Sequence, residues 1–140
     1  METTCMAQTA VGRKVRQKDG RPRVTGEARY YADVRFEHML HVFILRSPYP
    51  QADIIRLNAD PARALKGVHL VMTHENYPSV FRRTVHYVGD LVAAVVAESR
   101  DLAERAARLI EVEYERKPFV LDMDKAMQPD SPQVFEGQPN

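Results

Sequence analysis

A run of seven apolar residues, LVAAVVA at positions 91–97, constrains the fold of this chain more than any other feature. Its near-continuous apolar character predicts a strand over 91–99 that is buried on both faces, as in the centre of a sheet. The run is far shorter than the roughly 20 apolar residues that a membrane-spanning helix needs. Ser99 then favours the start of a helix over 100–110, because a serine side chain caps the first helical amides. The predicted inward stripe of that helix consists of Leu102, Ala106, Leu109 and Ile110.

The remaining sequence mixes short strands and short helices without an internal repeat. Further strands are expected over residues 39–47, 52–58, 68–73 and 112–115. Asp60 and Pro61 predict a short helix that Asp60 caps and that Gly67 stops in a left-handed conformation. Asp122 is expected to open a last short helix, which Pro129 ends. This mixture predicts an α+β fold, a mixed β-sheet with two main helices packed on it.

The two ends of the chain differ in composition from its middle. Residues 1–12 are polar and small and are predicted to form a disordered tail. Residues 13–23 hold six basic side chains, and the Asp-Gly pair and proline among them favour an extended leader with turns over a helix. Residues 129–140 are rich in proline and glutamine, which is typical of a linker. The globular domain is therefore placed at residues 13–128.

Composition excludes several classes of protein. The chain has 140 residues, of which 44% are hydrophobic and 28% charged, as expected for a globular domain and not for a disordered one. Its net charge of +1 gives no overall field that would attract nucleic acid or an acidic membrane. Cys5 is the only cysteine, so neither an internal disulfide nor a thiolate metal cage is expected. Together with an N-terminus unlike a secretory signal, this favours the cytoplasm.

The five histidines do not follow a metal-binding pattern. His38 and His41 are three positions apart at the start of a strand, an odd spacing, so their side chains are expected to face opposite ways. His69 lies in a predicted strand, His74 in the turn after it and His86 in a separate loop. None is paired with another on a helix. We interpret them as surface or hydrogen-bonded residues.

Motifs for catalysis and for phosphate binding are not found in the sequence. Glu111, Glu113 and Glu115 alternate along one strand, as a solvent-facing side does. Ser47 and Ser99 are not part of a nucleophile elbow, and the glycines form neither G-x-G-x-x-G nor a P-loop. The sequence therefore predicts no catalytic, cofactor-binding or metal-binding residue in this chain.

The basic segment 13–23 leaves one alternative open. Its positive charges could contact phosphates, although no aromatic side chain is interleaved with them before Tyr30. A solvated or partner-covered arm is the preferred interpretation, with nucleic-acid binding as the alternative.

Three blocks of sequence, in order, resemble the opening domain of the molybdenum hydroxylases, the family of xanthine dehydrogenase and aldehyde oxidase. The first is VGRKVRQKDGRPRVTGEARYYADV (11–34), in which Gly26, Ala28, Tyr30 and Asp33 match the family leader. The second is LHVFILRSPYPQADIIRLNADPARALKGVHLVMTHENYP (40–78). The third is VHYVGDLVAAVVAESRDLAERAARLIEVEYERKPFVLDMDKAM (85–127). The three blocks span nearly the whole chain.

The resemblance implies a fold and an enzyme. The fold would be the α/β hammerhead domain at the start of the molybdopterin-binding large subunit. In that family the large subunit binds molybdopterin cytosine dinucleotide and hydroxylates aromatic heterocycles or aldehydes. Electrons pass to two [2Fe–2S] clusters and commonly to FAD, on iron–sulfur and flavin domains or subunits. The family's cofactor loops and general base lie in domains after the hammerhead, so the resemblance implies a packing domain that is inactive alone. A non-catalytic interaction or assembly module of the same fold is the alternative.

Overall fold

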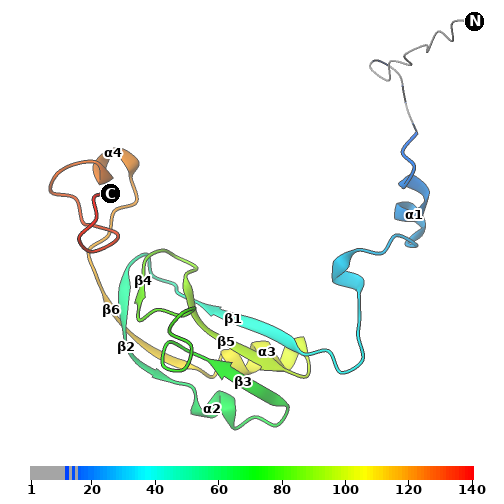
Figure 1. Ribbon diagram of the computed structural model, residues 1–140, viewed down its shortest axis with the longest axis horizontal. Helices are drawn as coiled ribbons and strands as arrows, with labels where there is room; N and C mark the ends of the chain where they lie inside the picture. The colour runs from blue at the N-terminus through cyan, green and yellow to red at the C-terminus, as the bar shows by residue number, and fades with distance from the viewer. Residues whose placement is uncertain (1–11, 13, 15) are drawn as a thin grey trace, which may run out of the picture. The chain divides into compact units, whose positions relative to one another are not determined.

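The computed structural model describes Gly12, Lys14 and residues 16–140. The predicted disordered tail therefore lies outside the described residues, except for Gly12. By its contacts the chain divides into two compact units, the first ending at Glu37 and the second comprising His38–Asn140 (Figure 1).

The first unit contains a helix in the basic segment, where the sequence predicted none. Helix α1 spans Gly20–Thr25 and ends at Gly26, which has a left-handed φ of 78°. Pro22 is tolerated because it lies in the first turn, where the backbone N–H groups need no intrahelical partner. An ion pair between Arg23 and Asp19 bridges one turn. The expectation of an extended leader over residues 13–23 is therefore wrong at residues 20–23, where α1 overlaps it.

A short 3-10 helix follows in the same unit. This helix, η1, spans Tyr31–Asp33. The backbone N–H of Tyr30 donates to the Asp33 carboxylate at 3.0 Å, which fixes the start of the turn.

The second unit is built from two three-stranded sheets. The first, sheet A, has the order β1-β5-β3, with β1 at His41–Arg46, β5 at Leu91–Ala97 and β3 at Val68–Met72. The second, sheet B, has the order β4-β2-β6, with β4 at Thr84–Val85, β2 at Ala52–Asn58 and β6 at Glu111–Arg116. Every described pairing is antiparallel. The α+β fold class is confirmed, but the strands form two sheets where one was expected. Strand β4 was missed because two residues are too few to show an alternating pattern.

Strand β5 is the central strand of sheet A, as its apolar run predicted. It pairs with β1 on one side and with β3 on the other. Ala93, Val95 and Ala97 on one face and Val92 on the other are fully buried, whereas Val96 is only half-buried. A polar side chain at the fully buried positions would lose water without gaining a partner, which explains the apolar run.

Helix α3 (Arg100–Ala107) packs on sheet A. The Ser99 hydroxyl accepts a hydrogen bond from the Leu102 amide at 3.2 Å, which confirms the predicted cap. The buried stripe is made of small residues, Ala103, Ala106 and Ala107, followed by Ile110. Leu109 was predicted to face inward but is 41% exposed, because the helix ends at Ala107 and the chain then changes direction.

Two short helices complete the second unit. Helix α2 spans Asp60–Arg63, and Gly67 after it has a left-handed φ of 88°. Asp60 does not cap α2: the side chain of Asn58 accepts from the Asp60 amide at 3.2 Å instead. Helix α4 spans Met123–Ala126, and its predicted cap is confirmed by the Asp122 carboxylate, which accepts from the Lys125 amide at 2.8 Å.

The core of the second unit has two parts. One lies between sheet A and helices α2 and α3 and contains Val71, Val95 and Ile110. The other contains Ile54 from β2, Val85 from β4 and Val92 from β5. Leu45, Leu57 and Val112 contact both parts, so the two sheets share one continuous apolar interior.

Candidate functional site

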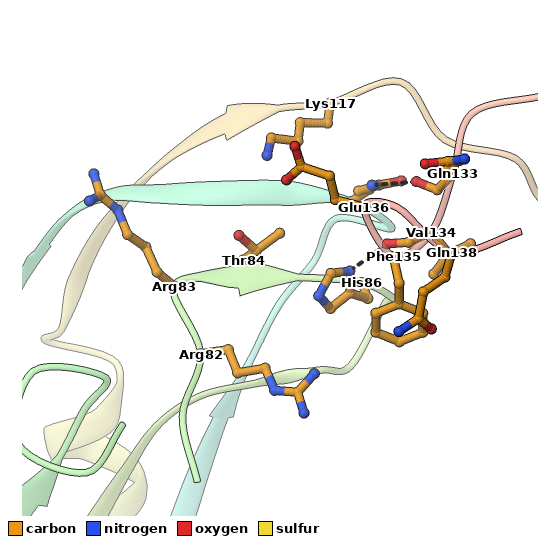
Figure 2. Close-up of a pocket in the computed structure, with 11 residues that line it drawn as sticks. Arg82, Arg83, Thr84, His86, Lys117, Gln133, Val134, Phe135, Glu136 and Gln138 are labelled. Atoms are coloured by element: carbon orange, nitrogen blue, oxygen red, sulfur yellow. Dashed lines mark hydrogen bonds between the residues drawn. The ribbon is translucent and has the colours of Figure 1, made fainter. Parts of the chain in front are cut away.

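A hollow of about 620 Å³ lies where β4, the end of β6 and the C-terminal segment meet (Figure 2). Most of its lining residues have polar or charged side chains. The lining consists of Gln51, Arg82, Arg83, Thr84, His86, Lys117, Gln133, Val134, Phe135, Glu136 and Gln138. Small-molecule sites are concave and usually lined by apolar side chains with a few convergent polar groups, so the directions in which the charged groups of this hollow point decide whether it fits a ligand.

The C-terminal wall of the hollow is held by contacts to His86 and Gln51. The His86 Nδ1 atom donates to the Val134 carbonyl oxygen at 2.8 Å, and the rings of His86 and Phe135 are 4.5 Å apart. The Gln51 side-chain amide donates to the Gln133 carbonyl oxygen at 3.1 Å. These contacts bring residues 133–135 to the edge of sheet B. The assignment of residues 129–140 as a linker stays a prediction.

Lys117, directly after β6, forms an ion pair with Asp53. The Lys117 Nζ atom is 2.7 Å from an Asp53 carboxylate oxygen, and the Thr84 hydroxyl donates to the other oxygen at 2.6 Å. Burial raises the pKa of Asp53, but these two hydrogen bonds and the charges of Lys117 and Arg83 outweigh it and hold the pKa below 3.8. The hydrogen bond to Asp53 raises the pKa of Lys117 above 10.5. The ammonium group is thus committed to a partner within the sheet.

The two arginines of the hollow do not converge on one point. Figure 2 shows the side chains of Arg82 and Arg83 leaving the chain in different directions. The Arg83 Nε atom donates to the Ile54 carbonyl oxygen at 3.2 Å, which ties this side chain to β2. A clamp for a phosphate or carboxylate needs donors that point to the same anion. The charged groups of the hollow therefore connect the strands of sheet B to one another by polar contacts and do not form an anion clamp.

A second group of side chains joins the start of β2 to β6. The Arg116 guanidinium lies 4.3 Å from the centre of the Tyr49 ring and donates to the Tyr49 hydroxyl at 3.0 Å. Tyr49 and Tyr114 meet edge to face, with ring centres 5.2 Å apart. Burial, and then the neighbouring Tyr49, raise the pKa of Tyr114 above 10.0. A tyrosine whose pKa is raised in this way is not an activated base, so a packing role follows.

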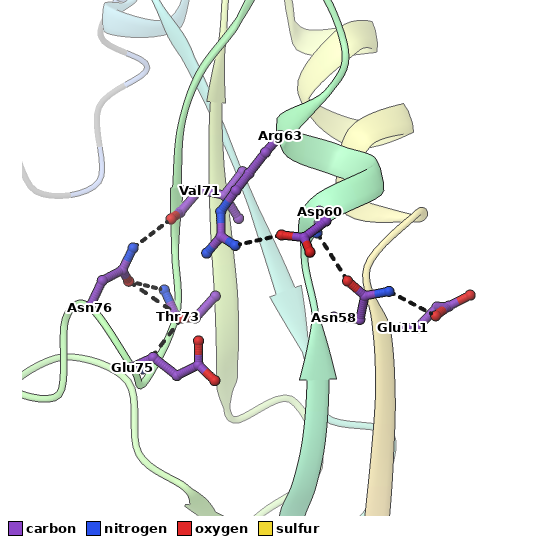
Figure 3. A network of polar contacts seen from close by, with 8 residues as sticks. All are labelled: Asn58, Asp60, Arg63, Val71, Thr73, Glu75, Asn76 and Glu111. Carbon is purple, nitrogen blue, oxygen red and sulfur yellow. Dashed lines mark hydrogen bonds and ion pairs between the residues drawn. The ribbon is translucent and has the colours of Figure 1, made fainter.

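Figure 3 shows a polar network around α2 and the turn after β3, which Asn76 closes. The side-chain oxygen of Asn76, Oδ1, accepts from the Thr73 backbone amide at 2.7 Å. The side-chain NH₂ group of Asn76 donates to the Val71 backbone carbonyl oxygen at 2.9 Å. Asn58 connects α2 to β6, since its NH₂ group donates to the Glu111 carboxylate at 3.2 Å. These amides satisfy backbone groups that the strand ends leave open, which is a structural role.

The histidines are dispersed, as expected. His41 lies in β1, His69 is 3.5 Å from the Glu98 carboxylate, and His86 contacts the C-terminal segment. His38 has a positive φ of 57° and His74 lies in the turn after β3. Within residues 16–140 and the two described residues before them, no group of three or more His, Cys, Asp or Glu residues could hold a metal ion. Glu111, Glu113 and Glu115 are exposed on β6, which confirms the predicted solvent-facing side.

The chain's glycines do not form a cradle for the pyrophosphate of a dinucleotide cofactor. Such a cradle needs consecutive backbone amides left open by small residues at a helix start. A side chain added at Gly67 would meet Leu102 and Glu98 of the same domain, so this glycine permits internal packing. Gly89 donates its amide to the Ser47 carbonyl oxygen at 2.8 Å and is likewise engaged. The glycines therefore offer no backbone cradle for the pyrophosphate of molybdopterin cytosine dinucleotide.

Sequence reasoning did not find the hollow or the Lys117–Asp53–Thr84 group. The three side chains come from β6, β2 and β4 or their ends, so their meeting depends on pairing between distant strands. The charged residues were visible in the sequence, but no local pattern relates them.

Comparison with known proteins identifies the family to which this fold belongs. Residues 25–118 match the family described as aldehyde oxidase and xanthine dehydrogenase, a/b hammerhead domain. The chain belongs to this family. Among its relatives, a probable xanthine dehydrogenase subunit of Bacillus subtilis (strain 168) is 37% identical in an alignment 131 residues long, which covers 84% of this chain and 18% of the relative. The nicotinate dehydrogenase large molybdopterin subunit of Eubacterium barkeri is 31% identical in an alignment 137 residues long, which covers 89% of this chain and 32% of that protein.

Solved structures of the family share the hammerhead architecture. Quinoline 2-oxidoreductase from Pseudomonas putida 86 superposes with a TM-score of 0.77 at 33% identity, over 84% of this chain and 18% of that one. Reconstituted CO dehydrogenase from Oligotropha carboxidovorans gives 0.79 at 30% identity, over 86% and 17%. The hammerhead domain thus spans less than a third of each of these relatives. No helix among the described residues has the length and apolar character to cross a membrane.

Proposed function

We propose that this hammerhead domain is a structural part of the large subunit of a xanthine dehydrogenase-like molybdenum oxidoreductase and is inactive by itself. The observation that carries the proposal is the family match over residues 25–118, together with relatives in which the matched segment is 18% of the protein. The whole enzyme's chemistry is assigned to the polypeptide outside this segment. The polar groups described above support that assignment, since Lys117, Asp53 and Thr84 bind one another within the domain.

The proposed partners are the cofactor-binding domains of the same subunit and the iron–sulfur and flavin subunits of the same enzyme. The proposed cofactors, held on those partners, are molybdopterin cytosine dinucleotide, [2Fe–2S] clusters and FAD. The Eubacterium barkeri relative is by name a large molybdopterin subunit, and a relative from Paenarthrobacter nicotinovorans is the gamma subunit of a dehydrogenase complex. Location in the cytoplasm stays a prediction from the single cysteine.

Metal analysis of the purified 140-residue chain tests this proposal. Produced in a host that makes the molybdenum cofactor, the chain is expected to contain no molybdenum and no iron above trace amounts and to oxidise neither xanthine nor an aldehyde. The same chain produced together with the cofactor-binding polypeptide is expected to copurify with molybdenum. Stoichiometric molybdenum in the isolated chain would contradict the proposal, as would failure of the two polypeptides to associate.

A further inference from the structure

One side of sheet A presents an apolar surface that the rest of the second unit leaves partly exposed. The register places Val42 of β1, Val96 of β5 and Leu70 of β3 in one row across the sheet. Ile44, Ala94 and Met72 form the next row. We call this surface the outer apolar face; it consists of Val42, Ile44, Leu70, Met72 and Val96, whereas Ala94, between Ile44 and Met72, is only 2% exposed. Val42 is 56% exposed, Ile44 37% and Leu70 38%.

The opposite side of the same three strands is covered. Phe43 of β1, Val95 of β5 and Val71 of β3 alternate with the outer residues and point into the core below α2 and α3. Successive side chains of a strand point to opposite faces, so the helices bury one row and leave the next. Sheet A is therefore apolar on both sides, a composition that normally accompanies covering layers on both sides.

Sheet B shows how the same domain builds a side that faces water. On β6, the exposed residues Glu111, Glu113 and Glu115 alternate with the half-buried Val112 and Tyr114. The outer apolar face has no such charges; the nearest on β1 is Arg46 at the strand end, whose guanidinium donates to the Gly89 carbonyl oxygen at 2.8 Å. The contrast indicates that the outer apolar face is adapted to a partner and sheet B to solvent.

We propose that the outer apolar face is the surface by which this domain packs against the cofactor-binding part of its own large subunit. The occupant is an uncharged, apolar surface of that polypeptide. This inference rests on the proposed function and names the surface that carries it out. The relatives supply the reason for the occupant, because the matched segment is 18% of the Bacillus subtilis protein and 32% of the Eubacterium barkeri one. Most of each relative is thus available within the same polypeptide, where covalent linkage gives a high effective concentration.

Charge introduced into the outer apolar face tests the proposal. The 140-residue chain is titrated against the cofactor-binding polypeptide that completes the large subunit, produced as a separate chain, by isothermal titration calorimetry. The double variant V42D/I44D is expected to lose about tenfold or more in affinity, since a buried unpaired carboxylate is strongly unfavourable. V42T/I44T keeps a branched side chain suited to a strand and is expected to weaken binding in the same direction. The matched control is E113K on sheet B, which changes a charge on an exposed strand and is expected to bind as the wild type does.

Each result has a defined consequence. Circular dichroism and thermal melting show which variants remain folded. If V42D/I44D does not fold, the affinity of V42T/I44T tests the inference instead. If the wild-type chain binds and the folded face variants bind with the same affinity, this inference is overturned and the proposed function is retained. Absence of wild-type binding overturns both. Sedimentation experiments test whether the face binds a second copy of the chain. If the wild-type chain forms dimers, the face variants do not, and the cofactor-binding polypeptide does not dissociate the dimer, then the face belongs to a second copy and the inference is overturned.

Discussion

At the scale of single residues, Gly67 shows how one backbone position joins two elements. It follows α2 with a φ of 88°, a region that side chains with a Cβ atom enter at a cost. Its carbonyl oxygen accepts from the Glu98 amide at 3.0 Å, so the loop lies directly beside the end of β5. A Cβ atom here would be 2.8 Å from Leu102 Cδ2, closer than van der Waals contact allows.

Gly67→Ala is expected to lower the free energy of unfolding by about 1–3 kcal/mol, from backbone strain together with displacement of Leu102. Urea denaturation followed by circular dichroism measures the change. Gly89→Ala is the control, because Gly89 also has a positive φ, 94°, but has open space around it. Equal losses in the two variants would show that the close contact contributes nothing.

Asp53 gives the fold a dependence on pH. Its pKa in the folded chain lies below 3.8 because the hydrogen bonds from Lys117 and Thr84 and the nearby positive charges outweigh the effect of burial. A carboxyl group with a lowered folded pKa stabilises the fold above its unfolded pKa, and this contribution is lost as the pH falls through the folded value.

Asp53→Asn is therefore expected to destabilise the chain at neutral pH and to differ less and less from the wild type as the pH falls below 3.8. Urea unfolding midpoints over a series of pH values measure this. Asp130→Asn removes an exposed carboxylate elsewhere and serves as the control. A difference between wild type and Asp53→Asn that stays constant through the acid range would refute the assignment of the effect to this carboxylate.

At the scale of elements, the packing of α3 on sheet A depends on small side chains. Ala103, Ala106 and Ala107 are all fully buried against the sheet. Because alanine extends only one carbon from the helix backbone, the helix approaches the strands closely, and larger residues at these positions would force them apart.

Ala106→Leu is expected to lower the free energy of unfolding by about 1–3 kcal/mol through overpacking. Differential scanning calorimetry measures it as a lower melting temperature. Arg105→Leu places the same side chain one residue earlier, on the exposed side of α3, and is expected to leave the melting temperature nearly unchanged. If Ala106→Leu is no less stable than Arg105→Leu, the close helix–sheet approach is not required for stability.

At the scale of the whole molecule, charge is balanced. The chain carries 20 Lys and Arg residues against 19 Asp and Glu residues. In the described part of the basic segment, Arg23 forms an ion pair with Asp19 along α1. This ion pair neutralises one of the six positive charges of residues 13–23, and no aromatic side chain that could stack on a base is interleaved with the others before Tyr30.

The chain is accordingly expected to leave the electrophoretic mobility of a short DNA duplex or an RNA strand unchanged at low salt, where nonspecific binding is strongest. A concentration-dependent mobility shift that disappears as salt is added would establish the nucleic-acid alternative instead.

Local sequence patterns were sufficient for the features that depend on neighbours along the chain. The apolar run at 91–97 predicted a central strand because a strand covered on both faces cannot accommodate polar groups without partners. Ser99 and Asp122 predicted helix starts because caps act within a few residues. Gly67 has the predicted left-handed φ, but α2 ends earlier, at Arg63 with Ala64 as its C-cap, so the prediction that Gly67 stops this helix is wrong. The three ordered blocks were sufficient for the family, since the match over residues 25–118 confirms it.

Only the tertiary structure decided which strands pair and what their pairing brings together. Strand β4 has two residues and is defined by its partner β2, and the division into two sheets follows from such long-range pairing. The Thr84–Asp53 hydrogen bond joins residues 31 positions apart, and the exposure of Val42 depends on which side of sheet A the helices cover. The physical reason is that the local sequence determines whether a segment is a strand or a helix and where a helix is capped, whereas strand pairing and burial depend on contacts between distant parts of the chain.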